Sequence, residues 1–165
     1  MTSERLVVIA DAGPIIALSI VGQLDVLGQL FGRVLVPEAV YGEVVVQGKG
    51  RPGSGELARA AWAERIKVSP PPDALLAEEL GPGEAEAISL GVRLGADVVL
   101  MDERKGRRIA TLAYHLRVKG TAGVLVLAKQ RGHVPLVRPL LEAMRAGGYY
   151  IAESLVAFAS SQAGE

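Results

Sequence analysis

The stretch VVIADAGPIIAL, residues 7–18, decides the fold because it places a carboxylate in the middle of an apolar run. Residues 6–10 are apolar and rich in β-branched side chains, which is typical of a buried strand. Pro14 suits the first turn of a helix, where its missing N–H costs nothing. An ionised carboxylate is costly to bury unless a partner, hydrogen bonds or a metal ion compensates its charge. The stretch therefore predicts a buried strand that leads through Asp11 into a helix, with a compensating group beside Asp11.

A second stretch, DVVLMDERKGRR at residues 97–108, repeats the pattern, with Asp102 directly after an apolar run. Such strand-like runs alternate with helix-like segments along the chain. Strands are expected at 6–10, 33–36, 66–69, 97–101 and 117–120. Helices are expected at 14–21, 24–31, 37–47, 56–65, 73–80, 84–94, 103–115, 121–131, 135–146 and 153–160. This alternation predicts an α/β fold with a mainly parallel central sheet. Functional sites in such sheets form at the carboxyl ends of the strands, where both aspartates are expected.

The length and composition are those of an ordinary single domain. The chain has 165 residues, half of them hydrophobic, which is enough for one core. We expect one domain over 1–165, with its core at about 5–131 and a C-terminal helical extension at about 132–165. No apolar run approaches the ~20 residues that a membrane span needs, and the first residues lack the pattern of a secretory signal. A cytoplasmic location is therefore expected.

The numbers of cysteines, histidines and charged residues exclude several classes of functional site. The chain has no cysteine, which excludes disulfides, thiolate zinc sites and Cys nucleophiles. Two histidines, His115 and His133, give little support to a histidine metal site or a Ser-His-Asp triad. The 18 basic and 18 acidic residues cancel, so the overall charge does not indicate a nucleic-acid partner. Carboxylates remain the main candidates for chemistry.

Each acidic residue also has an ordinary explanation. Asp11 and Asp102 both precede helices, so each is explained equally well as a helix N-cap. Glu84 and Glu86 lie in GPGEAEAISLGV, residues 81–92, where a rotation of ~100° per residue separates them. Glu86 falls on the solvent face and is interpreted as a surface charge. Glu84 falls on the apolar side, where its ordinary explanation is the positive end of the helix dipole.

Two further segments carry charges of interest. Glu43 lies in the middle of an expected helix among largely apolar neighbours, with a solvated side chain as its ordinary explanation. Helix 103–115 has one basic side that includes Arg104, Arg107 and Arg108. This basic side begins two residues after Asp102, so its first turn is expected to border the acidic site. Its ordinary explanation is a solvated face.

Together, the four acids resemble the pattern of the PIN-domain ribonucleases. The resemblance covers about residues 5–131 and is closest to the prokaryotic PIN-like subgroup related to VapC-type toxins, with GEAEAI, LMDERKGRRIA and KGTAGVL as its motifs. It implies a three-layer α/β/α fold and hydrolysis of RNA phosphodiester bonds with Mg²⁺ or Mn²⁺. Carried over by position, the catalytic and metal-binding acids are Asp11, Glu43, Glu84 and Asp102.

The chain departs from the family pattern after the first aspartate. The family usually has a hydroxyl residue there, whereas Ala12 and Gly13 follow Asp11 in this chain. A hydrogen bond that would support the site is thereby lost, which puts catalytic strength in doubt. Thr121, in KGTAG, is a candidate for supplying a hydroxyl near the site.

The expected partners follow from the same resemblance. The substrate is RNA, and because the net charge is zero, its phosphates are expected to meet Arg104, Arg107 and Arg108. An antitoxin protein is a further expected partner if the chain is the toxin of a toxin–antitoxin pair. A homodimer or higher homo-oligomer is expected, and no membrane.

Alternatives from other classes stay open. The chain is also explained as a catalytically silent PIN-like module that binds RNA or a protein. A Toprim-like metal-dependent enzyme is less well supported, because Arg104 stands where that family has its second Asp and because Asp11 stays unexplained. A haloacid-dehalogenase-like phosphatase needs Asp two positions after the first Asp, where this chain has Gly13.

Overall fold

The computed structural model describes residues 5–165, and its centre is a five-stranded sheet in the order β3-β2-β1-β4-β5. All neighbouring strands are parallel. The strands are β1 Val8–Ala10, β2 Val34–Pro37, β3 Ala63–Ile66, β4 Val98–Leu100 and β5 Val118–Lys119. The predicted α/β fold with a parallel sheet is confirmed.

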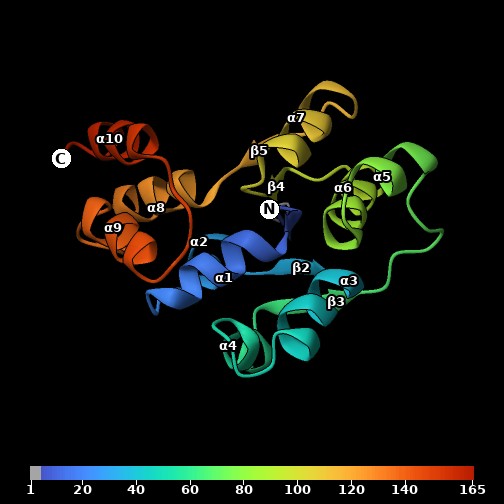
Figure 1. The fold of residues 1–165 in the computed structure, drawn as a ribbon, viewed down its shortest axis with the longest axis horizontal. Helices are drawn as coiled ribbons and strands as arrows, with labels where there is room; N and C mark the ends of the chain where they lie inside the picture. Colours follow the sequence, from blue (N-terminus) through green and yellow to red (C-terminus); the bar gives the residue numbers. More distant parts are fainter. Residues whose placement is uncertain (1–4) are drawn as a thin grey trace.

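Helices cover both faces of this sheet, which gives three layers (Figure 1). One face packs against α1 Ala12–Ile20, α2 Val26–Phe31, α4 Ser54–Arg59, α8 Thr121–Gln130, α9 Arg138–Ala146 and α10 Glu153–Gln162. The other face packs against α5 Ala74–Glu79, α6 Pro82–Leu94 and α7 Arg104–Leu112. Side chains of successive strand residues point to opposite faces, so Val8 and Ala10 lie in the first core and Ile9 lies in the second.

The strand order brings the two predicted aspartates together. The chain leaves β1 toward β2 on one side, whereas β4 lies on the other side of β1 and continues to β5. Such a reversal leaves a crevice at the carboxyl ends of the two central strands. Asp11 follows β1 and Asp102 comes two residues after Leu100, at the end of β4, while the backbone N–H of Asp11 donates to the carbonyl of Leu100 at 2.9 Å.

The expected helix over 37–47 is divided into α3 Glu38–Tyr41 and a π-helix, η1 Gly42–Gln47. A π-helical turn rotates the side chains after it relative to a continued α-helix, and such turns are frequent at functional sites. Glu43 lies in the first turn of η1. Its orientation is therefore set by a local irregularity that apolar periodicity does not reveal.

The expected helix over 56–65 is wrong, because α4 ends at Arg59 and β3 begins at Ala63. The expected strand at 66–69 is correspondingly displaced. β3 is an edge strand, so its polar residues face solvent and form ion pairs with neighbouring side chains, Arg33 with Glu64 and Arg65 with Glu38. Such a polar edge strand lacks the apolar signal that identifies a buried strand.

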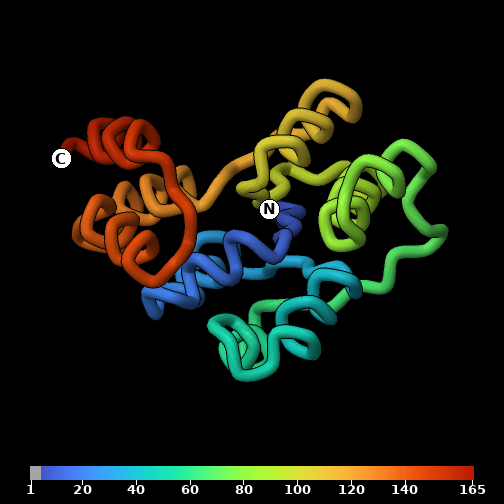
Figure 2. The backbone as a smooth tube through the Cα atoms, in the orientation of Figure 1, coloured from blue at the N-terminus to red at the C-terminus, as the bar shows by residue number. Residues whose placement is uncertain are grey.

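The C-terminal helices share the core of the sheet rather than lying apart from it. Val137, Leu141, Met144 and Val156 are fully buried in the same core as α1 and α8. Figure 2 shows the connection between α9 and α10 running past α1. Among residues 5–165, no helix is both long and apolar enough to cross a membrane.

Removal of a buried side chain from α9 tests this shared core. Leu141 is fully buried and Leu136, just before α9, is 47% exposed. We expect Leu141→Ala to lower the free energy of unfolding by about 2–5 kcal/mol and Leu136→Ala to change it by less than about 1 kcal/mol. Urea unfolding followed by circular dichroism measures both. Equal, small effects would show that α9 does not belong to the cooperative core.

Candidate active site

Asp11 is buried at the start of α1 without serving as an ordinary cap. It occupies the N-cap position of the helix, yet its side chain makes no capping hydrogen bond. Only 5% of its surface is exposed. Since a capping aspartate stabilises a helix by accepting a hydrogen bond from an N–H of the first turn, capping does not explain why this carboxylate is buried.

Asp102 is also not the cap of the helix that follows it. Glu103 caps α7, because its carboxylate accepts hydrogen bonds from the backbone N–H groups of Lys105 and Gly106 at 3.0 and 2.7 Å. Asp102 instead accepts three hydrogen bonds from two residues of other segments. Thr121 donates its backbone N–H at 2.7 Å and its hydroxyl at 2.6 Å, and the Tyr149 hydroxyl donates at 2.5 Å. These bonds hold Asp102 in one orientation at the end of β4.

Glu43 approaches Asp11 across Gly83, in the first turn of α6. A side-chain carbon built on Gly83 would lie 3.2 Å from Glu43 Oε2 and 3.5 Å from Asp11 Oδ1. A residue with a Cβ at this position would fill the space where the two carboxylates meet. The absence of a side chain at Gly83 therefore keeps open the space between η1 and the end of β1.

Glu84 and Glu103 form the next part of the acidic group. Glu84 lies in the first turn of α6, and its carboxylate reaches the N-terminus of α7. A side-chain carbon built on Gly106 would lie 2.9 Å from Glu84 Oε2 and 3.4 Å from Glu103 Oε2. Three helices, η1, α6 and α7, and the segments after β1 and β4 thus bring together five carboxylates, those of Asp11, Glu43, Glu84, Asp102 and Glu103.

The protonation of this group follows from burial and mutual repulsion. Burial, together with the nearby charges of Glu43, Asp102 and Glu103, raises the pKa of Asp11 to about 7, although the nearby backbone N–H of Ala12 acts in the opposite direction. Burial likewise raises the pKa of Glu84 to about 7, with added repulsion from Asp11, Glu103 and Glu43. Backbone N–H donors lower the pKa of Glu103 in spite of its partial burial. Two acids of the group are therefore readily protonated near neutral pH, which relieves the repulsion.

A divalent cation would relieve the same repulsion. Hard cations prefer carboxylate oxygens, and a small one is usually held by only one or two direct carboxylates, with water completing its shell. Within residues 5–165, no three acidic or histidine side chains lie close enough together to hold a metal ion between them. The Asp11–Glu43 and Glu84–Glu103 approaches are open pairs, which fit a cation that keeps part of its water.

The comparisons with known proteins agree with this geometry. The family model for the PIN domain matches residues 7–165, nearly the whole chain. The chain belongs to the PIN-domain family. No curated protein and no solved structure matches it significantly. PIN domains are generally nucleases, which are hydrolases, and they typically use divalent metal ions.

Two residues of this PIN-domain site, Glu103 and Tyr149, were not indicated by sequence patterns. Glu103 looked like part of the basic helix, although an acidic residue directly before a helix is a recognisable cap. Tyr149 lies between α9 and α10, 47 residues after Asp102, and no local pattern connects the two. Only the packing of the C-terminal helices brings Tyr149 to this position.

Glu86 is not the free surface charge that its position on the helix predicted. Its carboxylate accepts a hydrogen bond from the backbone N–H of Ala39 at 3.0 Å, in the first turn of α3. Glu86 thus ties α6 to α3, which precedes the π-helix that carries Glu43. A residue on the predicted solvent face acts instead as a link between two helices of this PIN domain.

The predicted basic face is divided by the structure. Arg107 is partly buried and donates to the carbonyl of Met101 at 3.2 Å. A side-chain carbon built on Gly120 would lie 2.5 Å from Arg107 Nη1 and 3.0 Å from Asp102 Oδ1, so the guanidinium lies near the Asp102 carboxylate. Arg104 and Arg108 are exposed. Arg107 therefore adds positive charge beside the acidic group.

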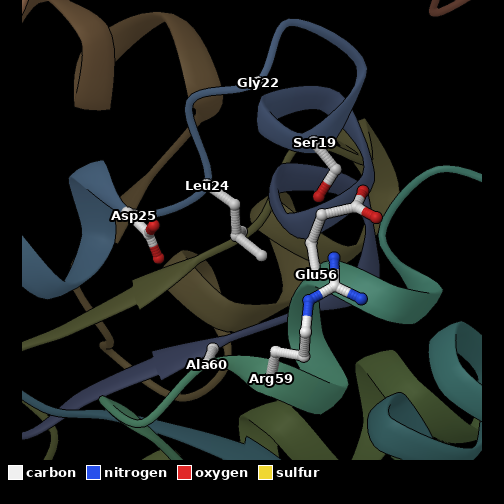
Figure 3. A pocket seen from close by; sticks show the side chains of 7 residues that line it. All are labelled: Ser19, Gly22, Leu24, Asp25, Glu56, Arg59 and Ala60. Carbon is white, nitrogen blue, oxygen red and sulfur yellow. The ribbon is translucent and has the colours of Figure 1, made fainter.

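A small hollow lies on another part of the protein, away from the acidic group. It measures about 180 Å³ and is lined by Ser19, Gly22, Leu24, Asp25, Glu56, Arg59 and Ala60 (Figure 3). Its two carboxylates already have partners, because Asp25 accepts from the indole N–H of Trp62 and Glu56 accepts from the backbone N–H of Gly53. The hollow therefore offers no free acidic ligands.

The raised pKa values predict how the metal-free protein responds to pH. The folded protein keeps protons on Asp11 and Glu84 up to about pH 7, whereas the unfolded chain releases them near its ordinary values of 3.8 and 4.5. Stability should therefore fall as pH rises from about 5 to 8. In a chelator, we expect the melting temperature to decrease by several degrees over this range.

Asp11→Asn is the matched variant for this pH dependence, because it removes the most buried acid and its charge. We expect it to flatten the decline between pH 5 and 8 and to raise the melting temperature at pH 8. Differential scanning calorimetry measures both proteins. A wild-type melting temperature that increases over the same range would contradict the described electrostatics.

The contact between Gly13 and Tyr149 gives a second prediction. A side-chain carbon on Gly13 would lie 2.8 Å from the Tyr149 hydroxyl, which is held by its bond to Asp102. Overpacking of this kind costs about 1–3 kcal/mol, whereas Ala favours a helix over Gly by up to about 1 kcal/mol. Gly13→Ala should therefore destabilise the wild type by roughly 1 kcal/mol.

The same substitution should be neutral or stabilising in Tyr149→Phe, because the hydroxyl is then absent. A double-mutant cycle by urea unfolding measures the coupling. An identical effect of Gly13→Ala in the two backgrounds would show that the hydroxyl does not occupy this space.

Proposed function

We propose that the protein is a Mg²⁺- or Mn²⁺-dependent endoribonuclease that hydrolyses RNA phosphodiester bonds. The observation that carries this proposal is the meeting of five carboxylates, the buried Asp11 among them, at the carboxyl ends of the two central strands. Acids gathered at such a cost in repulsion are typical of a cation site. Membership of a family of nucleases supports hydrolysis as the reaction.

The residues divide into ligands and supports. Asp11, Glu43, Glu84 and Asp102 are the proposed catalytic and metal-binding residues, and Glu103 joins them at the rim. When bound, a divalent cation supplies Lewis-acid activation of the phosphodiester and of the attacking water. Asp11 has a fixed position because the strand before it is buried. Asp102 has a fixed orientation because Thr121 and Tyr149 donate hydrogen bonds to it.

The hydroxyl groups that support Asp102 also compensate for the missing hydroxyl residue after Asp11, where this chain has Ala12 and Gly13. Thr121 and Tyr149 both donate a hydroxyl hydrogen bond to Asp102. Burial and the charge of Asp102 raise the pKa of Tyr149, so it stays a donor at neutral pH. Two hydroxyl groups are therefore present at the site although residues 12 and 13 carry none, which supports an active enzyme over a silent module.

The biological setting is a separate part of the proposal. We propose that the protein acts as the toxin of a toxin–antitoxin pair, with an antitoxin protein as partner and with a homodimer or higher homo-oligomer as its assembled form. The similarity of the motifs to VapC-type toxins supports this role. Co-expression with the product of the adjacent gene, followed by co-purification and a growth assay, tests it.

Cleavage of a fluorescent single-stranded RNA tests the enzymatic proposal. We expect cleavage with Mg²⁺ or Mn²⁺ and none with excess chelator. Asp11→Asn and Glu84→Gln should each lower the rate by about 100-fold or more, because loss of groups around a metal site costs at least 10–100-fold. Glu86→Gln is the control, since its amide oxygen still accepts the Ala39 N–H and it lies outside the acidic group.

The outcomes separate enzyme from binding module. A wild type that binds RNA and shows no metal-dependent cleavage is the silent module. Cleavage that survives Asp11→Asn would contradict the assigned site even if the protein is a nuclease.

A further inference from the structure

A cleft of about 870 Å³ opens beside Asp102, and we call it the β5–α10 cleft. One side is formed by the start of α7, by β5 and by α8, and the other side is formed by residues from Tyr149 to Gln162. Figure 1 shows α7 and α10 on either side of the β5–α8 segment. Of the acidic residues within 5–165, Asp102 alone lines the cleft, so the cleft leads directly to the acidic group.

The first side of the cleft is basic. Arg104, Arg107 and Lys119 line it. Within residues 5–165, none of the three forms an ion pair. Three positive charges without acidic partners, next to a single carboxylate, favour an anionic ligand. Arg108, by contrast, does not line the cleft.

The second side of the cleft presents aromatic and apolar side chains to solvent. Tyr150 is 87% exposed, Phe158 is 63% exposed and Leu155 is 43% exposed, and all three line the cleft. Folding does not explain such exposure, because large apolar side chains are stabilised by burial. Exposed aromatic rings beside positive charges are the combination with which proteins bind single-stranded nucleic acids.

The second side is connected to the acidic group by one hydrogen bond. Tyr149 donates to Asp102 at 2.5 Å, and Tyr150 is the next residue. The bond therefore places Tyr150 one residue away from the group that holds a proposed catalytic carboxylate. A chain of nucleotides in the cleft would have its bases near Tyr150 and its backbone near Asp102.

We propose that the β5–α10 cleft binds single-stranded RNA, with bases stacked on Tyr150 and Phe158 and phosphates in contact with Arg104 and Lys119. The inference deepens the proposed function and rests on it, because it names the strand state of the substrate and the residues that hold it. Duplex RNA is disfavoured, since its base faces are already stacked and its grooves are recognised mainly through shape and the sugar–phosphate backbone.

Binding is measured by fluorescence anisotropy with a labelled single-stranded RNA and with the matching duplex. The full-length Asp11→Asn protein is used with Mg²⁺ present, so that cleavage does not interfere. We expect tighter binding of the single strand. Tyr150→Ala and Phe158→Ala should each weaken it by about 10-fold, in line with base stacking on aromatic rings. Tyr150→Phe should keep most of the affinity, because it keeps the ring.

Salt dependence distinguishes the two sides of the cleft. Arg104→Ala and Lys119→Ala should each reduce the slope of log affinity against log salt by about 0.7. The aromatic variants should weaken binding with little change of slope. Leu112→Ala is the matched control, since Leu112 is 65% exposed in α7 and lies outside the cleft. Its affinity and slope should equal those of the parent protein.

Several results would overturn the inference. These are equal or tighter binding of the duplex, no binding of the single strand, and unchanged affinity in both aromatic variants. In the last case, wild-type protein that still cleaves RNA through Asp11 would leave the proposed function standing. If the aromatic variants lose RNA and the wild type does not cleave, the cleft is supported and the nuclease proposal fails.

Steady-state kinetics of the active protein test whether the aromatic residues act in binding or in catalysis. In otherwise wild-type protein, Tyr150→Ala and Phe158→Ala should raise KM for single-stranded RNA more than they lower kcat. A loss confined to kcat would contradict a role in binding the strand.

Discussion

Asp11 lies at the end of β1, where its backbone N–H donates to the Leu100 carbonyl of β4 and its side chain is almost wholly buried. This placement fixes a charge at the point where the strand order reverses. Neighbouring parallel strands end at the same edge of the sheet, so Asp102 comes close to Asp11 by topology alone. Further acids from η1, α6 and the start of α7 add repulsion that the fold by itself does not relieve.

The hydrogen bonds to Asp102 extend this constraint to the C-terminal part of the chain. Thr121 is the first residue of α8, and Tyr149 lies just before α10. The start of α8 and the segment before α10 are therefore both hydrogen-bonded to the Asp102 carboxylate. The C-terminal helices bury their apolar side chains in the core they share with α1. Packing on one face of the sheet thereby determines the orientation of a group at its edge.

The sequence alone was enough to indicate the central acidic residues, but not the residues that hydrogen-bond to them or to the neighbouring helices. Asp11 and Asp102 follow apolar strands, and Glu84 lies on the apolar side of a helix, so local periodicity reveals all three. The same periodicity assigned Glu86 to solvent, because it cannot show that the first turn of α3 places the backbone N–H of Ala39 beside this carboxylate. Tyr149 depends on contacts between segments far apart in the chain. The predicted position of β3 was too far along the chain, because edge strands carry polar residues that resemble a helix surface.

Anomalous X-ray diffraction from crystals grown with Mn²⁺ tests the central claim most directly. If the buried acid exists to bind a cation, a manganese peak should lie about 2 Å from a carboxylate oxygen of Asp11. A second ligand should come from Glu43, Glu84 or Asp102, with water completing the shell. Manganese found only on exposed carboxylates, with none beside Asp11, would contradict the account.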